Sequence, residues 1–383
     1  MMQESSSTAS DKPANGTGAT SMQRSVALDA LRGFDMFWLI GGTGLVSAIV
    51  DLGGPTIRSV LGPQLDHRPW EGCTFYDVIF PLFVFLVGMS VVFSMDRLKA
   101  EGCWWKVYRR ILRRFVLMFA FGLIYYGGLR NPLPGVRVFG VLQRLAVCYL
   151  FAALLYCHCR PRTLAAIAAT ILIGYWIFFS FVPVPDMNVT GTAQEMNWAR
   201  YMDEQYLPGA KHEGTWDANG IMSTFPAIST CLLGVFAAKL LKNGRHSQTR
   251  KVVYFLGGGL ALAVLGWIWG FQFPVIKKLW TSSYVLVTGG YSLMFLGVFC
   301  LIIDVWGFKW WTQPLVWIGA NPLTIYMARN FADFNAFADR FVGGSVAAAV
   351  TPEAAYFFHT AASFALSMAL VWFLYRKRIF LRV

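Results

Sequence analysis

Charged residues are scarce in this sequence, and acidic residues are scarcer than basic ones. Only 14% of the 383 residues are charged, whereas an ordinary soluble domain carries about a quarter. The sequence also lacks a basic segment followed by a short apolar core and a small-residue cleavage site, so we expect no removable signal peptide. The shortage of charge excludes an ordinary soluble globular protein.

Long apolar runs take the place of the missing charge. Each is about twenty residues long, the length that an α-helix needs to cross about 30 Å of hydrocarbon. The predicted fold class is therefore all-α, a polytopic integral membrane helix bundle with about ten transmembrane helices. The runs are 33–51, 74–95, 111–128, 139–157, 164–182, 220–241, 252–273, 281–303, 312–330 and 354–375.

The basic residues predict the orientation of this bundle. A net charge of +13 could suggest nucleic acid, but the Lys and Arg residues gather in the segments that alternate spans place on one side. Basic loops face the cytoplasm, so we expect both termini there. The expected partners are anionic membrane lipids, and no nucleic acid. The clusters are Lys12/Arg24/Arg32, 97–114, Arg160/Arg162, 239–251 and Arg376/Lys377/Arg378/Arg382.

The chain divides into a tail and one membrane domain. Residues 1–22 are rich in Ser, Thr, Gly and Ala without apolar periodicity, and they predict a disordered cytoplasmic tail. Residues 23–383 form a single transmembrane domain, with 52–73 and 183–219 as periplasmic loops. Long loops are often functional, and Trp198 and Trp216 in the second loop favour an ordered cap or substrate surface.

The most informative stretch runs from residue 64 to 81, at the expected outer face. Thr74 and Asp77 are spaced as a helix N-cap with an acid three residues later. Asp77 is therefore either a capping acid alone or also an orienting partner of His67. His67 is either a solvated loop residue or a general base or acyl acceptor, with Asp66 and Trp70 as neighbouring substrate contacts.

Polar residues inside the spans are the remaining candidates, because a charge at membrane depth is costly. Arg144 either extends outward to the membrane surface or lies beside the substrate, and Gln143 shares its position. The run Cys157-His158-Cys159 lacks a second ligand pair at the usual spacing, so we expect no metal site.

Several of these motifs resemble one known family. The chain is similar to the transmembrane acetyltransferases typified by heparan-α-glucosaminide N-acetyltransferase, and especially to their bacterial relatives. The block His67-x-x-Trp70-x-Gly72-x-Thr74-x-x-Asp77 is the most specific match. The others are residues 28–34 (LDALRGF), Phe80-Pro81, Gly88, residues 140–145 (GVLQRL), Leu233-Gly234 and residues 319–323 (GANPL).

The resemblance implies a membrane-bound acyltransferase. It would move an acetyl group from cytoplasmic acetyl-CoA, the co-substrate, to an amino sugar or glycan on the far side of a bacterial inner membrane. The family's catalytic histidine falls on His67. A functional asparagine of the family falls on or beside Thr43, which cannot reproduce the two donors of an amide. Either another group, such as Trp70 or Arg144, then supports the thioester carbonyl, or the acceptor differs, or the activity is lost.

The cytoplasmic ends of two spans carry the candidate donor-binding residues. Asp29 and Arg32 are three residues apart and predict a local helix pair. Arg110 and Arg113 lie on one side of the helix that enters the third span. They either contact lipid headgroups or attract the phosphates of CoA.

Two other functions compete with acetyl transfer. A multi-helix transporter or flippase of a sugar or lipid-linked substrate would also need many spans and buried charges. A related enzyme could instead attach another acyl group to a surface polysaccharide. The sequence identifies neither the acceptor nor the oligomeric state, and a homodimer is compatible with it.

Overall fold

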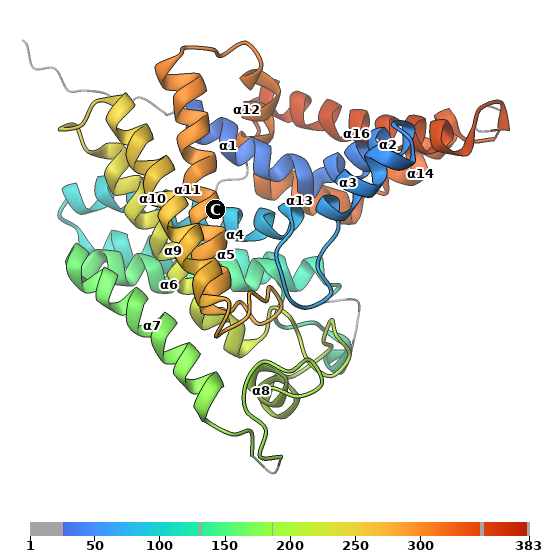
Figure 1. The fold of residues 1–383 in the computed structure, drawn as a ribbon. Helices are drawn as coiled ribbons and strands as arrows, with labels where there is room; N and C mark the ends of the chain where they lie inside the picture. Colours follow the sequence, from blue (N-terminus) through green and yellow to red (C-terminus); the bar gives the residue numbers. More distant parts are fainter. Residues whose placement is uncertain (1–25, 129, 131, 186, 345–347, 381–383) are drawn as a thin grey trace, which may run out of the picture.

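The computed structural model describes residues 26–128, 130, 132–185, 187–344 and 348–380, and the named secondary-structure elements within these ranges are all helices (Figure 1). The predicted tail, residues 1–22, lies outside the described residues. The long helices are α1 (Val26–Phe37), α4 (Phe75–Ala100), α5 (Trp104–Tyr125), α6 (Val141–His158), α7 (Pro161–Phe181), α9 (Ile221–Lys242), α10 (Gln248–Trp269), α11 (Ser282–Cys300) and α16 (Pro352–Arg376). The shorter ones are α2 (Thr43–Leu52), α3 (Pro55–Leu65), α8 (Trp198–Tyr206), α12 (Thr312–Ala320), α13 (Pro322–Phe331) and α14 (Phe334–Val342).

The all-α fold class is confirmed, and the chain is a multi-pass membrane protein. Within the described ranges, eight helical segments are long and apolar enough to cross a membrane. The first of them joins α1 to α2 through a π-helical segment, η1 (Trp38–Gly42). The third predicted run falls in α5, whose first half is rich in Arg and Lys.

The ninth predicted run, residues 312–330, is not one continuous helix. It is divided into α12 and α13 at Asn321, whose backbone φ of −132° and ψ of 48° is not helical. Proline disfavours the helical conformation of the residue before it, and Pro322 begins α13. The predicted loops 52–73 and 183–219 also contain helices, α3 and α8 respectively.

Glycines bring the central helices into direct backbone contact. A Cβ atom at Gly88 of α4 would overlap the carbonyl of Cys231 on α9, and one at Gly234 of α9 would overlap the carbonyl of Phe85. Small residues allow such close packing in membranes, where apolar burial does not drive helices together. Helices α4 and α9 are accordingly the most buried spans, whereas α7, α10 and α16 keep most of their surface exposed.

The bundle places two polar clusters at opposite ends of α4. Asp77 lies in its first turn, near the beginning of α6 and α9 and the loop before α11. Asp96 lies near its last turns, where Tyr156 of α6 and Lys242 of α9 contact it. The charge bias predicts that the Asp77 end faces outward and the Asp96 end faces the cytoplasm.

Candidate functional site

A cavity of about 340 Å³ opens at the Asp77 end of the bundle. Its walls come from the segment before α4, the first turns of α4 and α6, the loop after α8, and the loop between α10 and α11. It is strongly cationic, because five basic side chains and two histidines line it together with a single carboxylate, Glu213. The basic residues are Arg68, Arg137, Arg144, Lys277 and Lys278, and the histidines are His67 and His212.

The beginning of α4 fixes Asp77. Its Oδ2 atom accepts hydrogen bonds from the backbone N–H groups of Thr74 (3.1 Å) and Arg68 (3.2 Å), which confirms the predicted pairing of Thr74 with Asp77. Pro81 has no N–H to bond the Asp77 carbonyl four residues earlier. The Tyr284 hydroxyl donates to that carbonyl instead (2.7 Å), so α11 is tied to the first turn of α4.

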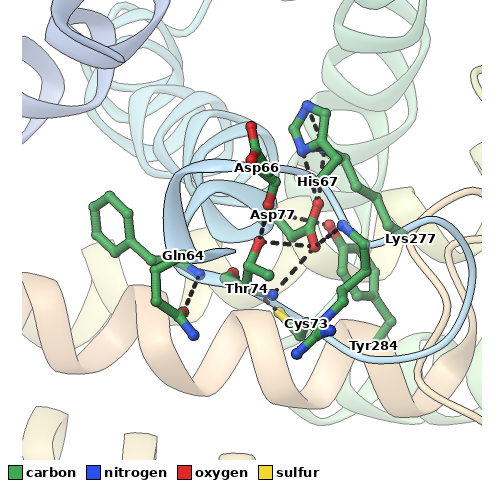
Figure 2. Close-up of polar contacts among 10 residues, drawn as sticks. Gln64, Asp66, His67, Cys73, Thr74, Asp77, Lys277 and Tyr284 are labelled. Carbon is green, nitrogen blue, oxygen red and sulfur yellow. Dashed lines mark hydrogen bonds and ion pairs between the residues drawn. The ribbon is translucent and has the colours of Figure 1, made fainter. Parts of the chain in front are cut away.

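His67, Asp77 and Lys277 form a compact cluster at the cavity wall (Figure 2). The Oδ1 atom of Asp77 is 2.8 Å from Nδ1 of His67 and 3.1 Å from Nζ of Lys277. Nζ of Lys277 is 2.8 Å from Nδ1 and 3.2 Å from Nε2 of the same ring. Asp77 is fully buried, whereas half of the His67 side chain is exposed. The carboxylate therefore contacts the His67 ring from the protein interior.

Two contacts keep the His67 ring and the Lys277 loop in place. The His67 ring stacks on Tyr76, with centroids 4.5 Å apart and an interplanar angle of 18°. The Gly72 N–H donates to the carbonyl of Val275 (2.8 Å), which joins the segment after His67 to the loop of Lys277. Burial lowers the pKa of Lys277 below its ordinary value, and the charge of Asp77 opposes that shift.

A second ion pair supports the opposite wall. Arg137 donates from Nε and Nη2 to the two carboxylate oxygens of Asp217, at 2.6 and 2.7 Å. Although burial alone opposes its charge, the hydrogen bonds to Asp217 raise the pKa of Arg137. Asp203 on α8 accepts from the backbone N–H groups of Asp217 and Ile221. Burial raises the pKa of Asp203 to about 6.

Arg144 lies inside the bundle rather than at the membrane surface. It is fully buried, its Nη2 donates to the Ala218 carbonyl (2.7 Å) and contacts the Ser223 hydroxyl, and its guanidinium lies over the Trp280 ring at 4.7 Å. Its Nε and Nη1 atoms have no hydrogen-bond partner among the described residues. Arg144 also lines the cavity, so its guanidinium lies beside the space that a ligand would occupy.

The other predicted substrate residues lie near this cavity but are not among those that line it. Asp66 is exposed, and its backbone carbonyl accepts from the Thr74 hydroxyl (2.7 Å). Trp70 donates to the Thr192 carbonyl (3.0 Å) and packs against Trp216, so it joins two loops.

Thr43 and Gln143 occupy different environments. Thr43 donates to the Trp38 carbonyl (2.9 Å) across η1. Gln143 is fully buried between α5 and α6, and its amide has no partner within the described part of the chain.

The predicted donor-binding residues lie away from the cavity. Asp29 and Arg32 form the expected ion pair within α1, with 3.1 Å between Oδ1 and Nη1. Arg110 donates to the Ser94 hydroxyl (2.9 Å). Arg113 is exposed on the same helix, so the two arginines remain candidates for a surface site at the predicted cytoplasmic end.

The sequence analysis missed Lys277, Arg137 and Asp217. All three belong to loops, where no helical period indicates which side chains face one another. Lys277 and Lys278 did carry one signal, because two adjacent lysines in a loop that is predicted to lie outside run against the positive-inside bias.

The fold and the site together define a polytopic helical membrane protein with an acid–base cluster in a cationic cavity. The family model described as "Heparan-alpha-glucosaminide N-acetyltransferase, catalytic" matches residues 24–266, and this chain belongs to that family. The match includes His67, Asp77 and Arg144, but Lys277 lies beyond it.

Two curated relatives carry the same name. The human heparan-alpha-glucosaminide N-acetyltransferase is 28% identical over 327 residues, covering 69% of this chain and 48% of the human protein. The mouse protein is 26% identical over 327 residues, covering 69% of this chain and 49% of its own length. The chain thus spans about half the length of the curated relatives it matches.

Proposed function

We propose that this protein transfers an acetyl group from acetyl-CoA to the amino group of a glucosamine-type sugar in the cavity. The observation that carries the proposal is His67, held by a buried carboxylate and open to a cavity, in a chain of the N-acetyltransferase family. A transporter would have no need for a histidine oriented in this way.

His67 acts as the general base in this proposal. With its Nδ1–H directed at Asp77 (2.8 Å), the imidazole presents Nε2 to an incoming amine. The amine attacks the thioester carbonyl, its proton passes to Nε2, and the C–S bond to CoA breaks. Buried Asp77 orients the ring and stabilises the imidazolium that forms.

Arg144 is the group best placed to stabilise the thioester oxygen. The family's asparagine is replaced by Thr43, whose hydroxyl is already bonded to the Trp38 carbonyl. Arg144 lines the cavity instead, and its Nε and Nη1 atoms have no hydrogen-bond partner among the described residues. Preorganised donors of this kind stabilise the negative charge that develops during acyl transfer.

A second cavity of about 390 Å³ supports a glycan as the acceptor. Its lining is mainly polar, and it shares Glu213 and Lys278 with the first cavity. These two side chains form an ion pair at 2.8 Å, with Arg200 and Trp216 further along the wall. When an amino sugar occupies the first cavity, a second sugar ring linked to it would therefore lie in the second cavity, beside carboxylate and cationic side chains.

Acetyl-CoA enters from the opposite end in this proposal, guided by Arg110 and Arg113. The unpartnered amide of Gln143 between α5 and α6 suits the amide groups of the pantetheine arm, since a buried polar group without a partner is costly. Sidedness is tested by labelling Gln205→Cys, at an exposed position, and Gly244→Cys, in open space. Gln205→Cys should react from outside and Gly244→Cys only after permeabilisation.

The activity is tested with purified protein, radiolabelled acetyl-CoA and a panel of amino sugars. We expect N-acetylated glucosamine, with a glucosamine-terminated disaccharide favoured over the monosaccharide. Sugar uptake into proteoliposomes without any acetylated product would support the transporter instead.

A further inference from the structure

Lys277 is an amine in the place where the acceptor's amine must react. Its Nζ lies 2.8 Å from Nδ1 and 3.2 Å from Nε2 of His67, and 3.1 Å from the buried Asp77 carboxylate. Figure 2 shows the lysine side chain directed at this pair. A group that gives up a proton to a general base must lie within this hydrogen-bond distance of it.

The neighbouring Lys278 has a different environment, although both lysines line the cavity. Its ammonium forms an ion pair with Glu213 at 2.8 Å. Lys277 lies against the histidine and is less exposed, with 20% of its side chain accessible against 27% for Lys278. Burial lowers the pKa of Lys277, which increases the fraction of neutral, nucleophilic amine.

We propose that Lys277 is a self-acetylation site, which takes the acetyl group from the donor when the cavity holds no amino sugar. This inference rests on the proposed acetyl transfer at His67. A C–N bond forms between Nζ and the acetyl carbon, the thioester C–S bond breaks, and CoA leaves as its thiol. The proton lost by the amine passes to Nε2 of His67 and from there to the thiolate or to water.

Acetylation at Lys277 limits the enzyme's own activity. The amide product is stable, so the acetyl group cannot move on to a sugar. It also removes the positive charge beside Asp77 and places extra atoms in the cavity of about 340 Å³ at the position the acceptor's amine needs. An acceptor bound in the cavity would displace Lys277 from His67 and protect it.

The test is peptide mass spectrometry of the full-length purified protein after incubation with isotope-labelled acetyl-CoA, with and without glucosamine. We expect one label on Lys277 that glucosamine suppresses and that His67→Ala abolishes. Lys278 is the internal control and should remain unlabelled. Preincubation with acetyl-CoA should lower the initial rate in proportion to the labelled fraction, and Lys277→Arg should remove that time dependence.

The outcomes separate this inference from the proposed function. If glucosamine is acetylated while Lys277 stays unmodified, self-acetylation is wrong and the proposed function stands. Equal labelling of Lys277 and Lys278, or labelling that persists in His67→Ala, would show uncatalysed chemistry and would also overturn it. If neither glucosamine nor Lys277 is acetylated, the proposed function itself fails.

Discussion

The two ends of α4 carry clusters with similar components and different surroundings. Asp77 joins His67 to Lys277 at the N-terminal end, and Asp96 joins Tyr156 to Lys242 near the C-terminal end. Asp77 is fully buried beside a cavity, whereas 35% of the Asp96 side chain is exposed.

The difference shows that a carboxylate and a lysine do not by themselves define a reactive site. Ion pairs with partial exposure contribute little and are screened by salt. At the N-terminal end of α4, a histidine and a buried carboxylate meet a cavity that can hold a substrate. The following predictions compare these regions, from the largest expected effect to the smallest.

Replacing the base should have the largest effect. His67→Ala should lower acetyl transfer by about a hundredfold or more, in line with the contribution of a positioned acid–base group. Folding should be unaffected because half of the side chain is exposed. Size-exclusion elution and melting temperature should match the wild type, and near-normal transfer by a folded variant would return the site to the transporter hypothesis.

The two carboxylates of α4 form a matched pair of variants. Asp77→Asn should reduce kcat by about tenfold or more, because an amide neither stabilises the imidazolium nor fixes the tautomer of His67. Asp96→Asn should leave kcat unchanged. Steady-state rates of the two variants would show equal losses if α4 contributed only as a structural helix.

Changes at Arg144 should separate chemistry from binding. If its free donors stabilise the thioester oxygen, Arg144→Gln should lower kcat by about tenfold or more while the KM for glucosamine changes little. A raised KM with an unchanged kcat would instead place Arg144 in ground-state sugar binding. Arg144→Lys keeps the charge but loses the planar set of donors, so it should recover only part of the rate.

The arginines at the other end should affect only the donor. Arg110→Gln with Arg113→Gln should raise the KM for acetyl-CoA a few-fold, and more strongly at low salt, because exposed charges are screened by ions. Arg250→Gln removes an equally exposed charge at the beginning of α10 and is the matched control. An unchanged KM would leave Arg110 and Arg113 as lipid contacts.

The smallest effect concerns stability near Asp203. Its pKa is about 6 in the folded protein, above the ordinary value, so the folded state binds more protons than the unfolded state between about pH 4 and 6. Stability should therefore fall as the pH rises through this window. Asp203→Asn should flatten this dependence, seen as a change of a few degrees in melting temperature.

Glu204 on the same helix is the control for that measurement. Although burial raises its pKa, hydrogen bonds from Thr215 and Arg200 lower it overall. Its contribution to stability should therefore increase as the pH rises. If Asp203→Asn and Glu204→Gln changed the pH dependence in the same direction, the assignment of Asp203 would be wrong.

The sequence predicted those features of the fold that depend on the length of apolar runs and on the spacing of residues a few positions apart. Apolar runs predicted the helices, and Thr74 with Asp77 predicted the beginning of α4, because both signals lie within one element. The break at Asn321–Pro322 was missed because the apolar character continues across it. Lys277 and His67 are 210 residues apart in the sequence, and no local pattern predicts a contact between residues so far apart.

Transfer across a sealed membrane tests the central proposal most directly. Proteoliposomes of known orientation would receive radiolabelled acetyl-CoA on the Arg110 side and glucosamine on the His67 side. We predict labelled N-acetylglucosamine on the His67 side with the wild-type protein and none above background with His67→Ala. Product from a correctly inserted His67→Ala variant, or none from the wild type, would contradict the account.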